Sequence, residues 1–143
     1  MPGHGRGAAG RSLSDPAVAA ALSRSKARLD GQRLYPRPVR LRFVHVWVTP
    51  WLFRLPWFRR FDGYTMWDWI FLRRPLGAGT TEDLLCHELC HVWQMQHHPL
   101  GMPLSYVLRG YARNPYELEA RRAASASTVR ENEKPGEVPP SMA

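Results

Sequence analysis

The residues whose types and spacing best suit chemistry are two histidines and a glutamate in the segment His87-Glu88-Leu89-Cys90-His91. On a helix the two histidines are one turn and about 40° apart, so both imidazoles can bind one metal ion. Zinc suits two neutral imidazoles and a carboxylate, with a fourth position left for water. Glu88 would project beside that position, accept a proton from the zinc-bound water and deliver it to a leaving amine. The segment therefore predicts a hydrolytic Zn²⁺ site with Glu88 as the general base.

A third protein ligand is needed, and a second predicted helix that begins at Asn114 offers two glutamates. Glu117 and Glu119 lie about 200° apart around such a helix, so only one of them can point at the metal. Glu117 has Ala120 on the next turn of its own face, which would permit a close approach to the motif helix. The alternative for Glu117 is a capping-box carboxylate that reaches back to the Asn114 amide.

The histidine motif, followed by Asn114-Pro115-Tyr116-Glu117-Leu118-Glu119-Ala120, resembles the gluzincin clan of zinc metallopeptidases. The likeness is closest to the smallest members of the clan, the minigluzincins, and covers roughly residues 60–125. It implies that His87, His91 and Glu117 are the metal ligands and that Glu88 is the general base. It also implies a strand beside the cleft, matched here by residues 64–72, whose edge pairs with an extended peptide.

One position departs from the family pattern. Members often have Asp four residues after the glutamate ligand, where it can hydrogen-bond a ligand histidine, and this chain has Arg121. The histidines must then be oriented by another residue, for which Asp83, Asp68 and Glu119 are the candidates. The donor that stabilises the oxyanion is also open. The nearby possibilities are Tyr106, Tyr111, Tyr116 and Arg113.

Helix signals place both motifs. Thr80 or Thr81 caps a helix with acidic residues in its first turn, and this helix should run to about residue 97 because Pro99 cannot continue it. Residues 103–112 predict a short helix. The pair Asn114-Pro115 then opens a last helix over residues 115–127.

The first half of the chain predicts strands. Asp15-Pro16 opens a short helix over residues 17–29, residues 39–48 and 64–72 have strand composition, and residues 51–61 form an aromatic connection. The fold class is therefore α+β, with a small antiparallel sheet followed by a helical part that carries the zinc motif and the glutamate ligand. We predict a basic, mostly disordered segment at 1–34, a minimal zincin-like domain at 35–127 and a disordered tail at 128–143.

Composition limits the other functions. The chain of 143 residues has 20 Lys+Arg against 12 Asp+Glu, a net charge of +8. Six basic and two acidic residues in segment 1–34 supply half of that excess, which weakens the case for a specific nucleic-acid-binding face. Cys86 and Cys90 are expected to be small core residues, and no disulfide, signal peptide or transmembrane segment is predicted. A cytoplasmic protein is the expectation.

The sequence thus predicts a zinc metallopeptidase that acts on a peptide or protein substrate. The alternatives are a catalytically inactive zinc-bound scaffold for protein contacts and a basic nucleic-acid-associated protein with structural zinc. Three arginines, Arg54, Arg59 and Arg60, lie among aromatic residues. The plainer interpretation is that they are solvated arginines on aromatic stems, and the alternative is a surface for acidic partners or anionic lipid.

Overall fold

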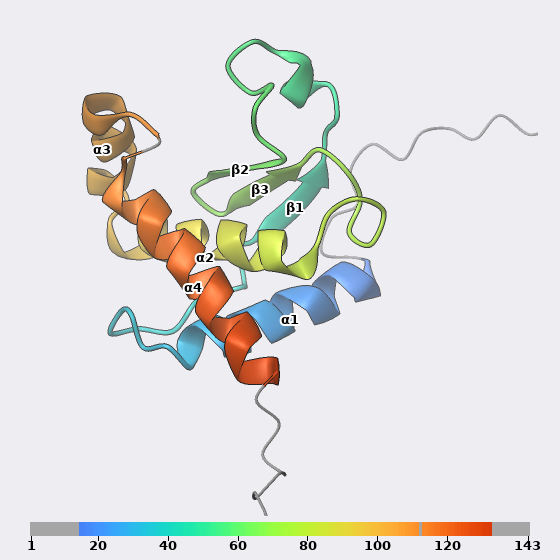
Figure 1. Ribbon diagram of the computed structural model, residues 1–143, viewed down its shortest axis with the longest axis vertical. Coiled ribbons are helices and arrows are strands. Elements are labelled where there is room, and N and C mark those ends of the chain that lie inside the picture. The colour runs from blue at the N-terminus through green and yellow to red at the C-terminus, as the bar shows by residue number, and fades with distance from the viewer. Residues whose placement is uncertain (1–14, 112, 133–143) are drawn as a thin grey trace, which may run out of the picture.

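The computed structural model describes residues 15–111 and 113–132, which form a mixed α+β structure with four α-helices and a small three-stranded sheet. In Figure 1 the sheet lies above helix α2 (Glu82–His97). Helix α1 (Pro16–Asp30) lies below α2, and helix α4 (Pro115–Asn132) crosses in front of α2. The α+β class predicted from the sequence is confirmed at this level. None of the described helices combines the length and apolar character that crossing a bilayer requires.

Helix α2 is the centre of the core. Thr81, one of the two residues predicted to cap this helix, accepts a hydrogen bond from the amide of Leu84. Side chains on most sides of the helix are buried, because α2 packs against α1, α4 and strands β2 (Gly63–Met66) and β3 (Trp69–Leu72). Cys86 and Cys90 are fully buried in this core, where they were predicted to lie.

The sheet differs from the prediction in three ways, the first being that the strand predicted over residues 39–48 is confined to residues 45–48. It is mixed, with order β1-β3-β2: β1 (His45–Val48) runs parallel to β3, and β2 runs antiparallel to β3. The predicted strand over residues 64–72 is in fact the hairpin β2–β3, which turns at Trp67 with a φ of 50°. The irregular connection over residues 49–62, which includes the short 3₁₀ helix Leu52–Arg54, brings the chain back so that β1 and β3 are parallel.

Helix α1 belongs to the same core as the rest of the chain. Asp15 caps it by accepting from the amide of Ala17, as predicted, and its apolar face buries Ala21, Leu22 and Leu29 completely. These side chains join one hydrophobic cluster with residues of the sheet, α2 and α4. The hydrophobic core therefore begins within α1 and not at residue 35, where the start of the domain was predicted.

The last helices differ slightly from the predicted bounds. Helix α3 (Gly101–Arg109) starts and ends earlier than residues 103–112, and residue 112 lies outside the described part of the chain. Helix α4 continues to Asn132, five residues beyond the predicted end. The tail predicted to be disordered from residue 128 is helical over residues 128–132, so its predicted start is wrong. The disorder predicted for the first 14 residues, and for the rest of the tail at 133–143, falls on positions that the structure does not describe.

Candidate metal centre

Helices α2 and α4 place the three predicted ligands together. On α2, His87 and His91 are one turn apart on the side that faces α4. On α4, the Asn114 side chain caps the helix by accepting from the amide of Tyr116, so Glu117 lies in the first turn. Ala120 is fully buried between the packed helices, which lets them approach closely.

The ligand atoms converge on one point. His87 Nε2 lies 3.0 Å from Glu117 Oε1, His91 Nε2 lies 3.0 Å from Glu117 Oε2, and the two Nε2 atoms are 3.2 Å apart. Ligands held about 2.0–2.1 Å from a tetrahedral zinc are about 3.3 Å from one another. The donor set and its spacing therefore fit a zinc ion bound by His87, His91 and Glu117.

The charge of Glu117 is stabilised by the histidines. Its side chain is 1% exposed. Burial would raise the pKa of Glu117, but its hydrogen bonds with His87 and His91 outweigh this effect and hold the pKa far below its ordinary 4.5. Burial lowers the pKa of His91, yet the hydrogen bond to Glu117 and the charge of Glu88 leave it above its ordinary 6.5. The carboxylate is thus kept ionised and available as a ligand.

Two phenols and a guanidinium surround the same carboxylate. The Tyr111 hydroxyl donates to Glu117 Oε1 at 3.0 Å, and the Tyr106 hydroxyl donates to Oε2 at 3.2 Å. Burial and the charge of Glu117 raise the pKa of both tyrosines, which keeps them protonated at neutral pH. Arg121 Nε lies 3.3 Å from Glu117 Oε1, with its side chain 52% exposed. Glu117 does not adopt the alternative arrangement predicted for it, in which its carboxylate would reach back to the Asn114 amide as in a capping box.

Gln94 orients His91, a role that the sequence analysis missed. Gln94 Oε1 lies 2.8 Å from His91 Nδ1, and Gln94 Nε2 donates to the Tyr116 carbonyl and to Glu119. Because the amide nitrogen is committed, Oε1 is the acceptor and His91 Nδ1 donates, which leaves Nε2 for the metal. The signal was present, since Gln94 follows His91 by three residues on the same helix face.

Glu119 supports this arrangement one step away from the histidine. It accepts hydrogen bonds from Gln94 and from the Tyr35 hydroxyl. The other two candidates for orienting a histidine lie elsewhere: Asp83 pairs with Arg28, and Asp68 accepts from Gln96. The histidine is therefore oriented by a neutral amide in place of a carboxylate.

Glu88 is held beside the ligands by the edge strand. Its side chain is buried, and its Oε2 accepts a hydrogen bond of 2.6 Å from Thr65 Oγ1 on β2. Gly63 gives it room, because a Cβ at that position would lie 2.8 Å from Glu88 Oε1. Neither Thr65 nor Gly63 was predicted, since their pairing with Glu88 depends on the position of the sheet on α2.

Two recesses meet at the centre. A cleft of about 310 Å³ lies between β2 and α3 and is mainly apolar. A second recess of about 560 Å³ is bordered by Arg60 and Arg121, and Glu88 and Tyr111 line both. Of the four predicted oxyanion donors, only Tyr106 and Tyr111 line the cleft. Tyr116 faces His98, and Arg113 is exposed.

No family model, no curated protein and no solved structure matches this chain.

Proposed function

We propose that the protein is a zinc-dependent peptidase in which His87, His91 and Glu117 hold the metal and Glu88 is the general base. The observation that supports this function is the convergence of two imidazoles and a carboxylate beside a buried glutamate at the base of a cleft. When bound, zinc would act as a Lewis acid that polarises a substrate carbonyl and acidifies water. Localisation in the cytoplasm remains part of the proposal.

Glu88 would move the proton. Its carboxylate accepts the proton of the attacking water and then gives it to the nitrogen of the leaving amine. Thr65 keeps the carboxylate in place through the bond to Oε2. The phenols of Tyr106 and Tyr111 lie beside the ligands, and each has a single proton that it donates to Glu117. Either phenol could donate to an oxyanion only after releasing its bond to that carboxylate.

The cleft suits an extended peptide. Strand β2 is at the edge of the sheet within the described residues, and it borders the cleft through Tyr64, Thr65 and Met66. An edge strand offers unpaired backbone donors and acceptors to an added strand. Met102 and Val107 on the opposite wall are apolar, which favours an apolar substrate side chain at this site.

The test is cleavage of a peptide library by the full chain loaded with one equivalent of zinc, read by mass spectrometry. Glu88→Gln should retain zinc and lose at least about a hundredfold in kcat/KM, because the general base is gone. Glu82→Gln is the matched control, since Glu82 is on the same helix but pairs with Arg24. Cleavage that survives Glu88→Gln would reject the mechanism, and a zinc-loaded protein that cleaves no peptide would reject the function.

A non-catalytic zinc scaffold is the second candidate, and the contact of Arg121 with Glu117 favours it. A cation on the ligand carboxylate reduces the negative charge available to the metal. In a scaffold, the zinc-loaded chain would cleave no peptide, and Glu88→Gln would leave partner binding unchanged.

A further inference from the structure

The connection between β1 and β2 exposes large apolar side chains. Within residues 51–60, here called the basic aromatic loop, Trp51 is 63% exposed, Leu55 is 42% exposed and Trp57 is 80% exposed. The loop projects beyond the sheet, away from α1 and the end of α4 (Figure 1). Large apolar side chains gathered at this exposure in one short loop are typical of an interaction surface.

The loop is built to present these side chains. Successive turns fix its backbone, with Leu52, Leu55 and Phe58 each donating an amide hydrogen bond to the residue three positions earlier. Phe53 is 3% exposed and anchors the loop from below, under the guanidinium of Arg73. An ordered backbone therefore holds the side chains of Trp51 and Trp57 in contact with solvent, where most of their surface is exposed.

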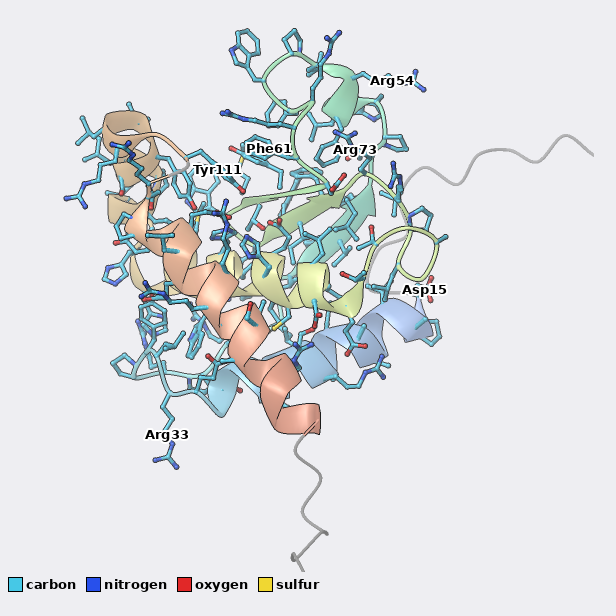
Figure 2. All side chains as sticks on the ribbon, in the orientation of Figure 1. Asp15, Arg33, Arg54, Phe61, Arg73 and Tyr111 are labelled. Carbon is cyan, nitrogen blue, oxygen red and sulfur yellow. The ribbon has the colours of Figure 1, made fainter. Side chains whose placement is uncertain are left out.

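The charge of the loop has one sign. Arg54, Arg59 and Arg60 are exposed, and residues 43–61 contain no aspartate or glutamate. Arg54 extends from the outer end of the loop (Figure 2). Exposed tryptophans interspersed with arginines suit a boundary between an apolar phase and negative charge.

We propose that the basic aromatic loop binds the interfacial region of an anionic phospholipid bilayer. Trp51, Leu55 and Trp57 would enter the boundary between headgroups and acyl chains, and Arg54 and Arg59 would pair with lipid phosphates and carboxylates. Leu55 and Pro56 between the aromatic residues favour lipid over nucleic acid, because aliphatic side chains gain little from base stacking.

Binding would bring the bilayer near the candidate metal centre. Phe58 contacts Tyr64 of β2 with ring centroids 5.0 Å apart, and Phe61 contacts Tyr111 at 4.6 Å. Phe61 and Tyr111 lie side by side between the loop and the centre (Figure 2). The proposal itself does not depend on metal binding or on peptidase activity.

The test is flotation of the full chain with vesicles of phosphatidylcholine alone or with roughly one-third phosphatidylserine. We expect binding only to the anionic vesicles, decreasing as salt is raised. The double variant Trp51→Ala/Trp57→Ala should weaken it about tenfold or more, and Arg54→Gln about fivefold.

Matched controls separate the loop from general basicity. Leu104→Ala/Leu108→Ala removes exposed apolar area from α3, and Arg33→Gln removes an exposed arginine at the opposite end of the molecule (Figure 2). Both controls should bind like the unaltered chain. The proposal is overturned if the anionic vesicles are not bound, if the controls lose as much as the loop variants, or if the loop variants lose only oligonucleotide or protein binding.

Discussion

The imidazole of His91 is oriented by a chain of hydrogen bonds that begins outside the cleft. Tyr35 donates to Glu119, Glu119 accepts from Gln94, and Gln94 accepts from His91. Each link removes one rotational or tautomeric choice, so that Nε2 faces Glu117 and His87 although no carboxylate bonds Nδ1 directly. These hydrogen bonds between single residues therefore determine how well His91 is oriented to bind a metal ion.

Replacement of Gln94 by leucine should weaken zinc binding by about 10- to 100-fold, because the acceptor for His91 Nδ1 is lost. The measurement is a competition titration against a fluorescent chelator, with circular dichroism to verify the fold. Gln96→Leu is the control, since Gln96 on the same helix bonds to Arg40 and Asp68 instead. Equal affinities of the two variants would contradict the role of Gln94.

Replacement of Arg121 by alanine should strengthen zinc binding. The guanidinium 3.3 Å from Glu117 competes with the metal for its charge, but its side chain is 52% exposed and solvent screens it. The gain is therefore limited to about fivefold, the upper range for an exposed ion pair. The same titration checks it, with the exposed neighbour Arg122→Ala as the control, and a loss of affinity in Arg121→Ala would show that the arginine supports the ligand instead.

The helices of the site could be predicted because local signals specify them. Thr81 before acidic residues and Asn114-Pro115 fix where α2 and α4 begin, and helical spacing then fixes which side chains share a face. The sheet could not be predicted equally well. Its hairpin turns at Trp67 without the glycine or asparagine that usually marks such a turn, and the parallel pairing of β1 with β3 depends on an irregular connection.

At the scale of elements, the distance between β2 and α2 sets the position of Glu88. Gly63→Ala would place a methyl group 2.8 Å from Glu88 Oε1 and displace the carboxylate. We expect zinc content to be retained and peptide cleavage to fall by roughly a hundredfold, as a shift of about 1 Å in a catalytic group can cause. The checks are elemental analysis and the rate on the best peptide.

The control for this substitution is Gly101→Ala in α3, where the nearest atom to an added Cβ lies 4.0 Å away. It should leave cleavage unchanged. Full activity in Gly63→Ala would mean that the strand does not fix the position of Glu88.

For the whole molecule, the core and the site share the same helix. Helix α2, which carries two of the candidate ligands, also packs on α1, whose Leu22 and Leu29 are fully buried. Helix α1 was predicted to lie outside the domain, because a short helix after a glycine-rich start has no local signal for its packing partner. The contacts that hold α2 in place are long-range, and helical periodicity alone does not reveal them.

The ionisation of Glu117 and His91 makes the stability of the fold depend on pH. Bound metal would change the direction of that dependence. The lowered pKa of Glu117 contributes stability above its ordinary value of 4.5, and this is lost as the pH falls below that value. The raised pKa of His91 contributes stability below its ordinary value of 6.5, and this is lost as the pH rises through the higher pKa of the folded state. In the metal-free protein, the site therefore stabilises the fold most at mildly acidic pH.

Bound zinc would reverse this trend, because it would bind the neutral imidazole and displace the proton from His91. The increase in Tm on addition of zinc should be small near about pH 6 and should grow toward about pH 8. Differential scanning fluorimetry with zinc or with a chelator measures both curves. Glu117→Gln should flatten the difference, since it removes a metal ligand and the partner that raises the His91 pKa. A zinc-induced shift in Tm that is the same at both pH values would contradict the assignment of His91 as a ligand whose proton the metal displaces.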